Sequence, residues 1–188
     1  MFAIVGLGNP GSTYSKNRHN IGYMIADIMA DAFDAKFARS KFEGLATTII
    51  HGKNFDIKDD FVMLKSTAFM NNSGNSVQKL MQFYKLKSEN IIVIHDDLDL
   101  ELADIRVKLG GSDAGHNGLR SITANIGSGY NRVRIGIGRP KIENSHNKGS
   151  AILNYVLGDF SNRELEILES ENVFQKASNE ALSIINGL

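Results

Sequence analysis

Residues 2–11 of the chain read FAIVGLGNPG, a short apolar run that ends in closely spaced glycines. Such a run, bounded by a turn signal, is typical of a buried strand. Residues 91–95, IIVIH, form a second run of this kind and lead into an acidic loop. Both segments therefore predict buried strands, and the rest of the fold can be placed around them.

Helical and strand patterns alternate along the remaining sequence. Apolar residues recur with helical spacing at residues 21–32, 77–84, 119–126 and 165–185. Further strands are predicted at residues 43–51 and 61–65, around a turn at 52–54, and at 105–109 and 132–138. This alternation predicts an α/β domain with a largely parallel or mixed sheet, in which sites form beyond the carboxyl ends of the strands.

The composition excludes several classes of protein. The 188 residues are 42% hydrophobic and 22% charged, as in ordinary globular domains, and no apolar run is long enough to span a membrane. Cysteine is absent, which rules out disulfides, thiolate nucleophiles and cysteine-ligated zinc. The first residues, MFAIVG, lack the basic segment of a signal peptide. These features favour a cytoplasmic protein.

The formal net charge is zero, but the charges are unevenly distributed. Residues 105–148 contain eight basic and two acidic residues, a net charge of +6, whereas residues 159–188 carry a net charge of −4. Such a split permits a local basic face that contacts nucleic acid. A solvated surface explains the same charges, so the charge pattern alone does not decide between the two.

The glycines of GLGNPG match the G-x-G-x-x-G fingerprint of dinucleotide-binding proteins. In that fingerprint a helix begins within the glycine turn, and a strand about 20 residues later ends in an acidic residue. Here the next residues, STYSKNRH, show no apolar helical stripe, and Asp27 and Asp31 lie inside the predicted first helix. The match therefore does not favour a nicotinamide or flavin site, although a nucleotide-binding oxidoreductase remains an alternative that a thermal shift with NAD(P) or flavin would support.

The loop after the first strand contains Asn9 and His19 among further polar residues. A lone histidine is more often structural than catalytic. This loop, however, is far more polar than a core segment, and a neutral imidazole is a suitable base near pH 7. His19 is therefore a candidate catalytic residue.

The segment FMNNSG, at residues 69–74, joins a predicted strand to a predicted helix. Asn72 or Ser73 suits the N-cap of that helix. Asn71 adds an amide that can donate and accept at once, and Phe69 and Met70 would line an apolar wall.

The segment HDDLDLE follows the second buried strand. Asp96, Asp97 and Asp99 could hold a divalent metal, but their spacing lacks the glycine and the terminal glutamate of a calcium loop. Alternatively, one aspartate orients a histidine, as in hydrolytic triads. The pattern alone leaves both readings open.

The segment GGSDAGHNG, at residues 110–118, is a flexible loop that leads into a helix. His116 and Asn117 would lie near the helix N-terminus, where anions and oxyanions are favoured. The plainer interpretation is a glycine turn with Asn117 as the N-cap. His51 and His146 are expected on the surface.

Taken together, GLGNPG, Tyr14 with RHN, FMNNSG, HDDLDL, GHNGL and RIGIG resemble the bacterial peptidyl-tRNA hydrolase family. The motifs occur in that family's order and spacing over residues 2–160. The resemblance implies a single α/β domain with a twisted mixed sheet flanked by helices, C-terminal helices, and no metal or cofactor. It also implies hydrolysis of the ester between a peptide and tRNA.

Roles for individual residues follow from the resemblance alone. His19 matches the catalytic base, Asp96 the carboxylate that holds it, and Asn9 the residue that distinguishes peptidyl from aminoacyl substrates. Positions that match or adjoin the substrate site are Tyr14, Phe69, Met70, Asn71, His116 and Asn117. Lys108 and Arg134 match basic residues that contact tRNA phosphate. The implied partner is tRNA, without a membrane or an obligate protein partner, and the expected state is a monomer.

Two departures from the family pattern affect loops. The chain reads KSTA at residues 65–68, where a proline usually precedes the FMN motif, and Asp113 and Ala114 stand where glycines are common. They leave the implied functional residues intact.

A non-catalytic RNA-binding module is the second alternative, and release of peptide from peptidyl-tRNA, assayed with and without EDTA, separates it from a hydrolase. Either Asn117 or Asn71 could donate to the oxyanion.

Overall fold

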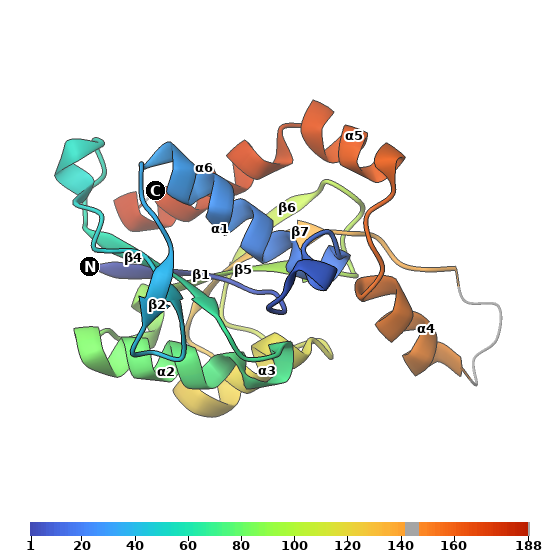
Figure 1. Ribbon diagram of the computed structural model, residues 1–188, viewed down its shortest axis with the longest axis horizontal. Coiled ribbons are helices and arrows are strands. Elements are labelled where there is room, and N and C mark those ends of the chain that lie inside the picture. The colour runs from blue at the N-terminus through green and yellow to red at the C-terminus, as the bar shows by residue number, and fades with distance from the viewer. Residues whose placement is uncertain (142–146, 188) are drawn as a thin grey trace.

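In the computed structural model, which describes residues 1–141 and 147–187, seven strands form one mixed sheet in the order β2-β3-β4-β1-β5-β7-β6 (Figure 1). Strands β4, β1, β5 and β7 are parallel, and the others run antiparallel to their neighbours. The bounds are β1 Phe2–Gly6, β2 Ala38–Ser40, β3 Gly44–Ala46, β4 Phe61–Ser66, β5 Ile91–Asp97, β6 Ile105–Leu109 and β7 Asn131–Gly136. The predicted α/β fold with a mixed, largely parallel sheet is confirmed.

Helices cover both faces of this sheet: α1 and α6 lie on one side, and α2 and α3 on the other, while α4 stands apart near the carboxyl ends of the central strands (Figure 1). Their bounds are α1 Ile21–Ala32, α2 Ser73–Tyr84, α3 Asn117–Ile126, α4 Lys148–Val156, α5 Asn162–Ser170 and α6 Val173–Asn186. No helix in the described residues is long and apolar enough to cross a membrane.

The two apolar runs form the centre of the core because successive strand residues face opposite sides. Ile4, Ile92 and Ile94 pack under α1 and α6, whereas Val5 and Val93 pack under α2 and α3. All five side chains are fully buried, and burial stabilises each by about 1.5–3 kcal/mol. A strand buried on both faces has no polar face, so its sequence is continuously apolar rather than alternating.

Two glycines allow α1 to approach the sheet closely. A Cβ on Gly6 would lie 2.4 Å from the carbonyl oxygen of Gly22, and a Cβ on Gly22 would lie 2.3 Å from that of Ile94. Between β1 and α1 the chain forms two short 3-10 turns, η1 (Ser12–Tyr14) and η2 (Arg18–Asn20). The helix therefore does not begin within the glycine turn, as a dinucleotide-binding fold would require.

Some elements differ from the sequence expectations. The strand expected over residues 43–51 ends at Ala46, because the Thr47 hydroxyl then accepts the N–H of Met63, and pairing resumes only as a single bridge at Ile50. Strand β2 and helix α4 were not predicted, since both are largely exposed and show no clear apolar pattern. His51 is on the surface as predicted, whereas His146 lies outside the described residues.

Candidate active site

The candidate site lies where the carboxyl ends of β1 and β5 meet. These neighbouring strands are parallel. The chain continues from β1 to α1 on one face, and from β5 through the edge strand β6 to α3 on the other. Divergent connections of this kind leave a crevice at the strand ends. A cavity of about 580 Å³ opens there, and its lining includes His19, Asp96 and His116.

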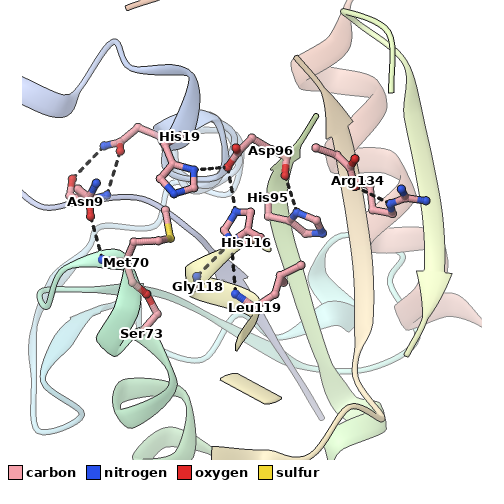
Figure 2. A network of polar contacts seen from close by, with 12 residues as sticks. Asn9, His19, Met70, Ser73, His95, Asp96, His116, Gly118, Leu119 and Arg134 are labelled. Carbon is pink, nitrogen blue, oxygen red and sulfur yellow. Dashed lines mark hydrogen bonds and ion pairs between the residues drawn. The ribbon is translucent and has the colours of Figure 1, made fainter. Parts of the chain in front are cut away.

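Two histidines converge on one buried carboxylate (Figure 2). The Nδ1 of His19 lies 2.8 Å from the Oδ1 of Asp96, and the Nε2 of His116 lies 3.0 Å from the same oxygen. The Asp96 side chain is 2% exposed. Although burial opposes ionisation, His19 and His116 hold the pKa of Asp96 well below its usual range. Asp96 is therefore a carboxylate that accepts from both rings.

This arrangement fixes the state of His19. Since Asp96 accepts at Nδ1, the proton of the neutral ring resides there, and Nε2 keeps its lone pair. Nε2 has no hydrogen-bond partner among the described residues. Burial alone would lower the pKa of His19, but the charge and hydrogen bond of Asp96 raise it above the ordinary 6.5. His19 can therefore accept a proton at an unoccupied nitrogen, with a carboxylate to stabilise the imidazolium.

His116 is held in the opposite tautomer. Its Nδ1 accepts the backbone N–H groups of Gly118 and Leu119 at 3.1 and 3.3 Å, so its ring proton is on Nε2 and is donated to Asp96. His116 is thus the N-cap of α3. The suggestion that Asn117 caps this helix was wrong, because the imidazole reaches the free N–H groups first and Asn117 already belongs to the helix.

The His19–Asp96–His116 cluster has the donor set of a metal site, with ligand atoms within 4.8 Å of one another. A neutral histidine that binds metal through Nε2 carries its proton on Nδ1. In His116 two backbone N–H groups point at Nδ1, so a proton there would face two other protons. The tautomer therefore favours a proton-handling network over metal ligation.

Asn9 is fixed by two partners on the other side of His19 (Figure 2). Asn20 pairs with the backbone of Asn9 through both ends of its amide, at 2.9 Å each. The Oδ1 of Asn9 accepts the N–H of Met70 at 2.8 Å. Because a backbone N–H can only donate, the amide oxygen must face Met70, and Nδ2 is the group that Asn9 offers to a ligand.

The other predicted substrate-site residues are distributed over two areas. The rings of Tyr14 and the exposed Phe69 lie edge to face with centroids 6.2 Å apart, and Asn71 is exposed in the turn that follows Phe69. These residues and Asn9 do not belong to the lining of the cavity, whereas Asn117, Lys108 and Arg134 do. His19 therefore lies between two areas of the described structure: the group of Asn9, Tyr14, Phe69 and Asn71 on one side, and the cavity with basic side chains on the other.

Basic side chains line the cavity wall formed by β6 and β7. Arg134 donates to Asp97 through Nε at 2.8 Å and Arg139 pairs with Asp99, so these acids bind arginines instead of gathering around a metal. Lys108 has no acidic partner among the described residues. The sequence showed the basic segment but not these pairings, which depend on the register between strands.

Two contributors to the site were missed in the sequence. Asn20 belongs to the RHN motif, but nothing in the sequence gives it a role, and only its contact with Asn9 reveals one. His95 packs edge-to-face on His116, with centroids 5.2 Å apart, and its Nδ1 contacts the carbonyl oxygen of Asp96 at 2.7 Å. Burial, together with His116, lowers the pKa of His95 to about 3, so this ring supports the cluster as a neutral group.

Comparison with known proteins identifies the family of the chain. A family model described as peptidyl-tRNA hydrolase matches residues 3–188. The chain belongs to the peptidyl-tRNA hydrolase family. Peptidyl-tRNA hydrolases of Clostridium botulinum (strain Eklund 17B / Type B) and Beijerinckia indica subsp. indica are 39% and 46% identical to it. These matches cover 100% and 90% of the chain and 96% and 80% of the relatives.

Solved structures agree. The crystal structure of peptidyl-tRNA hydrolase from Acinetobacter baumannii superposes with a TM-score of 0.78 at 32% identity, over 99% of this chain and 94% of that one. The chain is accordingly an enzyme with peptidyl-tRNA hydrolase activity, and the buried His19–Asp96–His116 cluster is consistent with a histidine-based site.

Proposed function

We propose that His19 acts as the general base that activates water for attack on the ester between peptide and tRNA. The observation that carries this proposal is the hydrogen bond of 2.8 Å between His19 and the buried Asp96, which leaves the lone pair of Nε2 unused among the described residues. As the proton moves from water to Nε2, Asp96 stabilises the imidazolium. When the tetrahedral intermediate collapses, the bond between the acyl carbon and the ribose oxygen breaks, the imidazolium returns its proton to that oxygen, and the peptide leaves with a free carboxyl group. The tRNA then returns to translation.

The tetrahedral intermediate requires a donor for its oxyanion. Asn117 lines the same cavity as His19, whereas Asn71 does not. The Oδ1 of Asn117 accepts from Arg120, which leaves Nδ2 free to donate. These observations favour Asn117 over Asn71 for this role.

Asn9 is proposed to recognise the peptide. Its Nδ2 can donate to a carbonyl of a peptidyl substrate, but an amide offers no charge to the free ammonium of an aminoacyl ester. The rest of the proposed substrate site beside Asn9 is formed by Tyr14, Phe69, Met70 and Asn71.

Asn9→Asp tests this recognition. One carboxylate oxygen would still accept the N–H of Met70, and the other would replace Nδ2 and attract an ammonium. We expect the ratio of aminoacyl-tRNA to peptidyl-tRNA hydrolysis to rise by at least about tenfold. The measurement is kcat/KM on both substrates, with Asn75→Asp on the exposed surface of α2 as control. An unchanged ratio would remove Asn9 from substrate discrimination.

Lys108 and Arg134 are proposed to contact tRNA phosphate from the basic wall. Lys108→Ala should raise KM for peptidyl-tRNA at low salt and reduce the slope of log KM against log salt by about 1, because one counterion-releasing contact is lost. The control is Lys36→Ala, at an exposed position after α1. An equal loss on a short ester without tRNA would show that Lys108 does not act through phosphate.

The proposed setting is the cytoplasm, where peptidyl-tRNA arises during translation, and the proposed active form is a monomer without metal or cofactor. Hydrolysis of purified peptidyl-tRNA with and without EDTA tests the chemistry. Unchanged rates are expected, and loss of activity that only a divalent metal restores would overturn the metal-free mechanism. Light scattering should give a mass near 20.7 kDa for the active species.

A further inference from the structure

Helix α4 forms one wall of the cavity, yet it has little packing of its own. Ile152, Leu153 and Val156 line the cavity, and within α4 only Val156 is buried. In Figure 1 the helix projects from the body of the molecule. Apart from its carboxyl end, where Val156 joins the core, α4 has little hydrophobic burial, so polar contacts at that end contribute to its position.

Arg18, the residue directly before His19, supplies three of those contacts. Its Nη1 donates to the carbonyl oxygens of Tyr155 and Gly158, both at 3.2 Å, and its backbone N–H also donates to Gly158. The guanidinium stacks on the ring of Tyr155, 4.3 Å from its centroid. A cation among the last carbonyls of a helix is favoured by the helix dipole.

The remaining guanidinium nitrogens bind the start of α5. Nε and Nη2 of Arg18 donate to the two carboxylate oxygens of Glu164 at 3.0 and 2.8 Å. Glu164 also accepts from Ser161 in a capping box. Although partial burial opposes it, the hydrogen bonds from Arg18 and Ser161 keep the pKa of Glu164 below its ordinary value. The side chains of Arg18 and Glu164 are only 12% and 18% exposed, so solvent screens this pair less than a surface pair.

We propose that Arg18 is a positioning residue that couples α4, the wall of the cavity, to the turn that carries His19. The inference rests on the proposed role of His19 in catalysis. Within η2, Arg18 points to the C-terminal helices and His19 to Asp96. One short turn thereby sets the distance between the base and the wall of the cavity. Small displacements of a catalytic group are costly for turnover.

Arg18→Lys and Glu164→Gln test the coupling. Lysine keeps the charge but cannot make the bidentate bonds, and glutamine keeps the shape of Glu164 without its charge. We expect Arg18→Lys to lower kcat by at least about tenfold and to raise KM, with Glu164→Gln smaller in both respects. The double variant should be no worse than Arg18→Lys, since both changes break one contact. Lys176→Met, which removes an exposed pair with Glu171, is the control and should change neither constant.

The constants must be measured well below the Tm of each variant. Unchanged kcat and KM with a lowered Tm would show a purely structural role and overturn the proposal. So would a rise in KM alone, because His19 would then be independent of Arg18. If Arg18→Lys does not fold, Glu164→Gln decides by the same criteria. His19→Ala assayed in parallel separates failure of the coupling from failure of His19 as the base.

Discussion

His19→Ala is expected to lower kcat for peptidyl-tRNA by about 10²–10⁴-fold, the contribution of a positioned general base. The reason is that no other described side chain combines a hydrogen bond to the Asp96 carboxylate with a free ring nitrogen. His116 already uses Nδ1 for backbone N–H groups and Nε2 for Asp96, and His95 contacts only the backbone carbonyl of Asp96. The measurement is single-turnover peptide release at saturating enzyme, which isolates the chemical step.

The fold should survive this substitution. Asp96 loses one of two donors, a change that costs about 1–3 kcal/mol, whereas domains of this kind have about 5–15 kcal/mol of stability. Circular dichroism should therefore be unchanged. His51→Ala is a matched control, because His51 also contacts an aspartate, Asp60, but on the surface. A fully active His19→Ala would exclude His19 as the base.

Asp96→Asn is expected to lower kcat by at least about tenfold with little change in KM. Asparagine can still present one oxygen to both rings, so the geometry can persist while the charge that stabilises the imidazolium disappears. Asp31→Asn on the exposed side of α1 is the control. An unchanged kcat would remove Asp96 from the mechanism, and a rise in KM alone would assign it to binding.

The central strands could be predicted because both of their faces are buried. Residues such as Ile4, Val5 and Ile92 face both sides of the sheet and are all fully buried, so the strand sequence is continuously apolar. Such a segment is recognised in the sequence as a buried strand. Strand β2 and helix α4 could not be predicted in this way. Each has few buried residues and depends on neighbours that are distant in sequence.

The candidate site shows the same division. His19 and Asp96 could be proposed as separate polar residues after strands, but their contact joins positions 77 residues apart. The contact of Arg18 with Glu164 spans 146 residues. The tautomer of a histidine is even harder to predict from the sequence. In His116 it is fixed by the backbone N–H groups at the start of α3, which donate to Nδ1. Residue type can suggest chemistry, whereas pairing and protonation require the fold.

The pH dependence of kcat/KM, measured for the parent enzyme and for Asp96→Asn, tests the central claim that a neutral His19 paired with Asp96 is the base. The base works only when unprotonated, so activity should rise with pH through a pKa above the ordinary 6.5. In Asp96→Asn, burial remains and the carboxylate is gone, so the acid limb should move to lower pH at a lower plateau rate. An acid limb at the same pH in both enzymes, or a parent rate that is flat across about pH 5–8, would contradict the account.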